Sequence, residues 1–123
     1  MTNVWIMRKV KGSPGGRGDR RVLVRADTIT YLSADDHQVR ATELGSDDLT
    51  VLADEKDGGH DAPLLPEGFN VDLLFAISEA RRRASEANDD PHQEDRVLVA
   101  QVYDGGWVWR EFRPSEPEPK PEP

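Results

Sequence analysis

Cysteine is absent from this chain of 123 residues. Its absence excludes disulfide bonds, thiol nucleophiles and cysteine-ligated metal sites, and it agrees with a reducing cytoplasm. The N-terminal apolar run, residues 4–7, is far shorter than the core of a signal peptide or a membrane span. We therefore expect a soluble, cytoplasmic protein that makes no contact with membranes.

Motifs for catalysis and metal binding are also missing. No GxSxG occurs, and His37, His60 and His92 lie in three separate expected loops without a pairing such as HExxH. The glycine-rich stretch 12–18 lacks the order of a phosphate-binding P-loop, and the acidic loop 54–68 lacks the ligand spacing of a calcium loop. We expect no catalytic residue, no metal and no cofactor, and hence a protein that is not an enzyme.

Charge is abundant but unevenly placed. Apolar residues make up 36% of the chain and charged residues 33%, which allows one domain with a small core and a highly charged surface. The net charge of −8 disfavours binding to nucleic acid or to anionic lipid. Residues 1–40 nevertheless carry eight Lys and Arg against four Asp, whereas residues 41–123 carry eight against twenty acidic residues. The overall charge therefore does not exclude a local basic surface on the N-terminal strands.

The sequence predicts one long helix, residues 70–87. Asn70 can cap its first turn, and the arginines 81–83 lie near the end where the helix dipole favours positive charge. At about 100° per residue, one apolar stripe is formed by Leu73, Ile77, Ala80 and Ala84. We expect this stripe to face a sheet. Val71 and Phe75 lie nearly opposite, where Phe75 either wraps against a neighbouring loop or strand end or projects as an anchor for a partner.

Short alternating segments predict seven strands around this helix. They are residues 4–10, 21–25, 28–33, 38–44, 49–53, 96–103 and 107–112. Turn residues recur about every ten positions, which is typical of an antiparallel meander. We therefore predict an α+β fold: one antiparallel meander sheet of about seven strands, strongly curved or a partial barrel, with one amphipathic helix packed on it. The folded domain is expected to cover residues 1–112, and the Pro- and Glu-rich tail 113–123 to be disordered.

The C-terminal hairpin, residues 96–112, is the basis on which we expect self-association. With residues 104–106 as its turn, one face carries Val97, Val99, Tyr103, Trp107 and Trp109. The other face carries Leu98, Ala100, Val102, Val108 and Phe112. Both faces are apolar, and a single helix covers only one side of a sheet. The three aromatic rings would expose roughly 450–750 Å², at or above the largest patch that a monomer usually leaves in water. We therefore expect a homodimer that buries the rings, and a barrel that encloses them is the alternative.

The leading functional hypothesis is a noncatalytic interaction protein, a homodimer that presents a surface to another protein. The alternative is a module that binds a phosphorylated metabolite or a nucleotide between the basic strands and the aromatic hairpin. The candidate ligand- or partner-binding residues are Arg21, Arg25, Arg40, Phe75, Tyr103, Trp107 and Trp109. Nucleic-acid contact is a third hypothesis, which the overall charge disfavours. It would use Lys9, Lys11, Arg17, Arg20 and Arg21.

Overall fold

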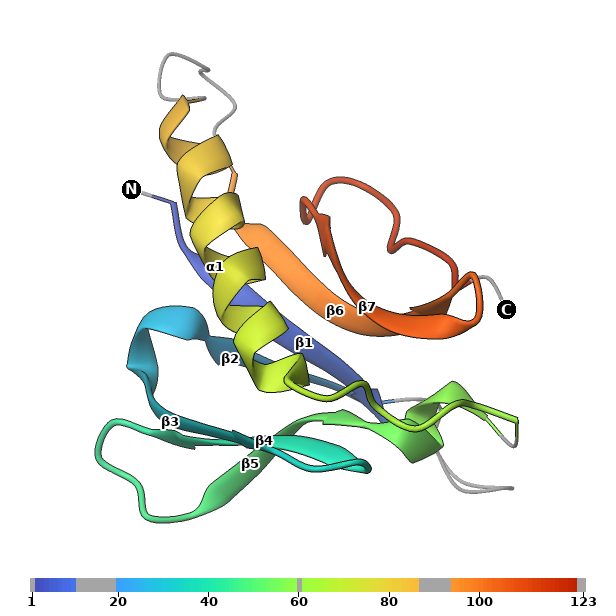
Figure 1. Ribbon diagram of the computed structural model, residues 1–123. Helices are drawn as coiled ribbons and strands as arrows, with labels where there is room; N and C mark the ends of the chain where they lie inside the picture. Colours follow the sequence, from blue (N-terminus) through green and yellow to red (C-terminus); the bar gives the residue numbers. More distant parts are fainter. Residues whose placement is uncertain (1, 11–19, 60, 87–93, 122–123) are drawn as a thin grey trace.

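The computed structural model describes residues 2–10, 20–59, 61–86 and 94–121, which form seven strands and one α-helix (Figure 1). The strands are β1 (Val4–Val10), β2 (Arg20–Arg25), β3 (Ile29–Ala34), β4 (Gln38–Glu43), β5 (Leu49–Asp54), β6 (Arg96–Tyr103) and β7 (Gly106–Phe112). The helix is α1 (Phe69–Glu86), and two short 3-10 helices, η1 (Ala26–Thr28) and η2 (Glu55–Gly58), follow β2 and β5. The predicted α+β class is confirmed, and the predicted strands and helix are present to within one residue. The predicted glycine-rich loop 12–18 lies outside the described residues.

The strands form two sheets, so the prediction of a single seven-stranded meander is wrong. The first sheet has four strands in the order β2-β1-β6-β7, and the second has three in the order β3-β4-β5. In the four-stranded sheet β1 runs parallel to β6, whereas the other neighbouring pairs in both sheets are antiparallel. Neither of these two sheets closes into a barrel.

The physical reason for this difference is a pairing between distant parts of the chain. After β2, η1 turns the chain out of the four-stranded sheet, and the Thr28 hydroxyl donates to the carbonyl of Arg25 at 2.8 Å to close this turn. β3 therefore starts a second sheet. The chain returns through α1, and this long crossover lets β6 pair in parallel with β1. Local patterns indicate where strands lie, but they do not indicate this neighbour.

α1 lies over the inner face of the four-stranded sheet, and its N-terminal end lies beside the three-stranded sheet (Figure 1). The whole predicted stripe, Leu73, Ile77, Ala80 and Ala84, is buried, which confirms that it faces a sheet. Apolar side chains of both sheets, such as Ile6, Leu52 and Leu98, pack with this stripe in one core. The helix thus covers one side of the four-stranded sheet.

The first turn of α1 differs from the prediction, because the helix begins at Phe69 and Asn70 is not its cap. Gly68 has a φ of 75°, and its carbonyl accepts from the Asp72 N–H at 3.0 Å. The Asn70 side chain instead donates to the carbonyl of Leu32 at 3.5 Å and so ties the helix to β3. The earlier start places the Phe69 ring in the core, where it is 1% exposed.

The β6–β7 hairpin has a two-residue turn. Asp104 and Gly105 have φ values of 51° and 83°, the positive values that a type I′ turn requires, and Tyr103 pairs directly with Gly106. The prediction counted Gly106 as part of the turn. Because side chains alternate along a strand, this one-residue slip turned every side chain of β7 to the wrong face.

Both tryptophans of β7 therefore lie on the inner face, opposite to Tyr103. Trp107 is 6% exposed, and its Nε1–H donates to the carbonyl of Pro63 at 2.8 Å. Trp109 stacks on Phe69 with 4.9 Å between ring centroids and 19° between ring planes, and its Nε1–H donates to the Phe69 carbonyl. The first turn of α1 and the loop before it cover these rings. Of the aromatic patch from which we expected a dimer, Trp107 is thus buried and Trp109 partly buried within the chain, whereas Tyr103 is 41% exposed on the outer face.

The outer face of the four-stranded sheet carries a second, smaller apolar cluster. It consists of Met7, Val97 and Val99, with Trp5 and Phe112 packed against them. The C-terminal segment, residues 113–121, arches beside β7 and lies against this face (Figure 1), where Gln101 donates to the Pro119 carbonyl. Such contacts do not measure how long the segment stays on the sheet, so the predicted disorder of residues 113–123 stays a prediction.

Candidate functional site

A cavity of about 280 Å³ lies at the end of the four-stranded sheet where β1 and β6 separate. The pairing between these strands stops at Met7 opposite Val99, although β1 continues to Val10 and β6 to Tyr103. The two parallel strands therefore diverge at their carboxyl ends, the position at which open sheets with parallel strands bind ligands. The lining of this cavity, called the β1–β6 cavity below, includes Arg8, Lys9, Asp54, Asp57, Gln101 and Trp107.

Arg8 brings a fixed positive charge to this lining. Its Nε–H donates to Asp57 at 2.9 Å, and its guanidinium lies 3.7 Å from Asp54. Arg8 follows Val4 and Ile6 on the inner, apolar side of β1, where a charge needs partners. The sequence pattern places Arg8 in this apolar set, and that is the one signal that could have indicated the site. The two carboxylates come from a distant part of the chain, which the pattern of β1 does not identify.

Asp54 is a buried carboxylate, only 8% exposed. It accepts hydrogen bonds from the Gln38 side chain at 2.8 Å and from the backbone N–H of Lys56 at 2.9 Å. Burial acts to raise the pKa of Asp54, but these two hydrogen bonds and the nearby Arg8 charge outweigh it, so the pKa lies below its ordinary value. Asp54 is therefore ionised at neutral pH and holds Arg8 in place.

An apolar wall and one buried amide complete the cavity. Gly58 allows η2 to approach the indole of Trp107, because a Cβ at residue 58 would lie 2.8 Å from Cζ2 of that ring. Gln101 is 7% exposed, and its Nε2–H donates to the carbonyl of Pro119. Its Oε1 has no hydrogen-bond partner among the described residues. A buried acceptor without a partner is uncommon in folded proteins and points to a missing donor.

The charges of the lining restrict the ligand. Asp54, Asp57 and Glu118 place three carboxylates around the cavity, against the two cations Arg8 and Lys9. Arg8 is already engaged by two of these carboxylates. The lining therefore favours a neutral or cationic small molecule over the phosphorylated ligand suggested by the sequence.

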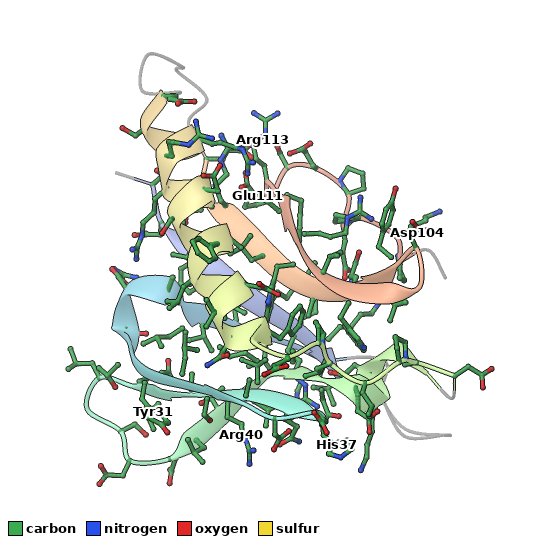
Figure 2. All side chains as sticks on the ribbon, in the orientation of Figure 1. Tyr31, His37, Arg40, Asp104, Glu111 and Arg113 are labelled. Carbon is green, nitrogen blue, oxygen red and sulfur yellow. The ribbon has the colours of Figure 1, made fainter. Side chains whose placement is uncertain are left out.

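The structure does not bring the three predicted arginines together. Arg21 and Arg25 share the outer face of the four-stranded sheet. Arg25 is engaged by Asp27 at 2.6 Å, and this contact holds the pKa of Asp27 below its ordinary value. Figure 2 shows Arg40 on the three-stranded sheet, far from Asp104 at the turn of the hairpin, and Arg40 pairs there with Asp35.

The predicted aromatic residues are divided between two faces. Tyr103 lies on the outer face, 41% exposed, with the Arg110 guanidinium 4.9 Å from its ring centroid. Trp107 and Trp109 lie on the inner face, and of these three residues only Trp107 lines the β1–β6 cavity. The residues that form the cavity are mostly ones that sequence patterns did not indicate.

Phe75 projects from α1. It is 68% exposed, so of the two sequence-based alternatives the structure shows the projecting side chain. Val71 is 47% and Leu74 is 53% exposed, and both lie within one helical turn of Phe75. We call these three residues the α1 patch. It is an apolar surface on the side of the helix opposite to the core.

His60 and His92 lie outside the residues that the structure describes. Within the described part of the chain, no group of three or more His, Asp or Glu side chains could hold a metal ion. Its one long helix is not apolar enough to cross a membrane. Comparison of the chain with protein-family models, curated proteins and solved structures found no match.

Proposed function

We propose that this protein is a noncatalytic interaction protein that binds a second copy of itself through the α1 patch. The observation that carries the proposal is the exposure of Val71, Leu74 and Phe75 on a helix whose opposite side is fully packed. Burial of a large apolar side chain contributes about 1.5–3 kcal/mol of favourable free energy, so covering Phe75 stabilises a complex by an amount of this order. The buried tryptophans of β7 play no part in this association.

The charges along α1 support an antiparallel, two-fold arrangement. Glu67 and Asp72 are exposed at the N-terminal end of the patch, and Arg81 is exposed beyond its C-terminal end, where Arg82 is already engaged by Glu79 and Glu86. In a two-fold pair with antiparallel helices, the acidic end of one copy faces the basic end of the other. A stable interface buries about 800 Å² per partner, so the patch forms its apolar centre and these charged residues form its rim.

Replacement of Phe75 by serine tests this interface. We expect F75S to weaken self-association at least roughly tenfold, because it removes the largest side chain of the patch and disturbs no buried contact. The measurement is the mass of the full chain by gel filtration with light scattering over the micromolar range. Tyr31→Ser is the matched control, since Tyr31 is a 59% exposed aromatic residue on the three-stranded sheet. A wild-type chain that stays monomeric, or an equal effect of Y31S, contradicts the proposal.

The β1–β6 cavity supports a second candidate function, the binding of a small polar molecule. The specific observation is the unpartnered Oε1 of Gln101, beside a cavity whose lining carries more negative than positive charge. The ligand class that fits is a neutral or cationic compound with an N–H or O–H donor.

A thermal-shift screen separates this candidate from the first. We expect amines, amides or nucleosides to raise the melting temperature of the wild-type chain, because a ligand that binds only the folded state stabilises it. The same compounds should have less effect on Gln101→Leu, which removes the acceptor. No shift with any of these compounds, or shifts with phosphorylated compounds alone, would count against the candidate.

A further inference from the structure

Two side chains of the four-stranded sheet hold the backbone of the C-terminal segment, residues 113–121. The Gln101 amide donates to the carbonyl of Pro119, and the Arg110 guanidinium donates to the carbonyl of Lys120 at 3.1 Å. Gln101 lies on β6 and Arg110 on β7, so neighbouring strands bind successive carbonyls of the segment. Bonds to backbone carbonyls depend on an accessible backbone and little on the bound side chains.

An ion pair joins the segment to the sheet. The guanidinium of Arg21 lies 3.5 Å from the carboxylate of Glu118. Besides Arg21, the same face carries Lys9 and Arg110 and one lining carboxylate, Asp95, whereas residues 113–121 hold two glutamates, one arginine and one lysine and are neutral overall. This outer face is therefore a basic surface that holds the proline-rich segment through the carboxylate of Glu118.

The segment covers the sheet without filling the space beneath it. A groove of about 450 Å³ lies between them, with Pro114 and Glu118 on its wall. Its floor is apolar and includes Trp5, Met7, Leu23, Val97 and Phe112. Residues 114–121 are Pro, Ser, Glu and Lys only, so the segment has no large apolar side chain that could reach this floor.

These features match the way in which proline-rich segments are recognised. Such segments favour the polyproline II helix, which exposes its carbonyls and loses little entropy on binding, and they dock in grooves lined by aromatic side chains. We infer that the outer face is a docking groove for a proline-rich segment of another protein that carries a carboxylate opposite Arg21 and one large apolar residue. The chain's own C-terminal segment is the competitor that covers this groove. This inference concerns a different surface from the α1 patch and does not depend on it.

The covalent link between the C-terminal segment and the sheet explains why the partner needs an apolar residue. A segment joined to its site by a short linker acts at an effective concentration in the millimolar range, so a free peptide with only the same contacts is outcompeted. A leucine that reaches the floor adds buried apolar area, which raises affinity roughly tenfold or more. The apolar floor therefore distinguishes a true partner from the chain's own segment.

The test uses the full chain and two fluorescent peptides that span residues 113–121. One peptide has the native sequence, and the other has leucine in place of Pro114, the residue that lies on the groove wall. In the protein, Glu118→Lys replaces the ion pair with Arg21 by a repulsion and releases the segment without touching the core. We expect E118K to bind the leucine peptide about tenfold more tightly than the native peptide, and at least tenfold more tightly than the wild-type chain does. Fluorescence anisotropy measures the affinities, and circular dichroism verifies folding.

Two further measurements fix the location. In the unaltered chain, the methyl resonance of Met7 should shift when the leucine peptide is added, because Met7 lies on the groove floor. Combining Arg21→Ser with E118K should reduce peptide binding at least fivefold, since it removes the cation that faces the peptide's Glu118 and leaves no ion pair that could hold the chain's own segment. Failure of folded E118K to bind the leucine peptide, or binding that leaves Met7 unshifted, overturns the inference. Dimers that form by exchange of the segment, and that Arg21→Ser disrupts, would show a second copy as the occupant and also overturn it.

Discussion

Asp54 links three parts of the chain through one buried carboxylate. It receives hydrogen bonds from Gln38 and Lys56 and lies beside Arg8. Because these partners hold its pKa below the ordinary value, the folded state binds this proton less readily than the unfolded state does. Its contribution to stability is therefore fully present above about pH 4, and it is lost as the pH falls through the lowered pKa of the folded state.

The variant Asp54→Asn tests this residue. At pH 7 we expect it to lower the free energy of unfolding by about 1–3 kcal/mol, because a charged acceptor of hydrogen bonds is removed. The difference from wild type should shrink at pH 3, because this pH lies below the ordinary pKa of an aspartate and the unfolded state then takes up the proton. Urea unfolding at both pH values measures this, and Asp47→Asn is a control of equal charge change at an exposed turn. A difference that is the same at both pH values would contradict the assigned role.

At the scale of elements, α1 and the hairpin show what sequence patterns can predict. The stripe of α1 was predictable because helical periodicity depends only on local spacing, and its four residues are all buried. The hairpin itself was also predictable, but its faces were not. The sequence of residues 104–106 is equally compatible with a two-residue and a three-residue turn. The length of the turn decides which side of β7 is buried.

The positive φ values of the two-residue turn lead to a prediction about stability. Gly105 has a φ of 83° with no atom within 4 Å of an added Cβ, so Gly105→Ala causes backbone strain without a steric clash. We expect a loss of about 1–2 kcal/mol in the free energy of unfolding. Gly106→Ala is the matched control, because Gly106 also has open space around it and lacks a positive φ. Equal stability of the two variants in denaturant titrations would show that the turn is not the one described.

For the whole molecule, the division into two sheets removes the reason for which the sequence suggested a dimer. We expected one sheet with two apolar faces and one helix to cover them. In the structure α1 and the loop before it cover the inner face, while the C-terminal segment lies over the outer face. The parallel pairing of β1 with β6 creates this arrangement, and it also opens the β1–β6 cavity. Neither follows from local patterns, because both depend on residues more than 80 positions apart.

We propose the α1 patch as the surface of self-association, and its position in a dimer can be measured directly. The chain has no cysteine, so Ser78→Cys, one turn after Phe75 on the same exposed side, and Ser46→Cys, in the turn after β4, each accept a single spin label. The measurement is pulsed dipolar spectroscopy of each labelled chain at a concentration where light scattering gives a dimer. A two-fold interface at α1 predicts a short distance between the two labels at residue 78 and a longer one at residue 46. A dimer in which the labels at residue 78 are farther apart than those at residue 46 would contradict it.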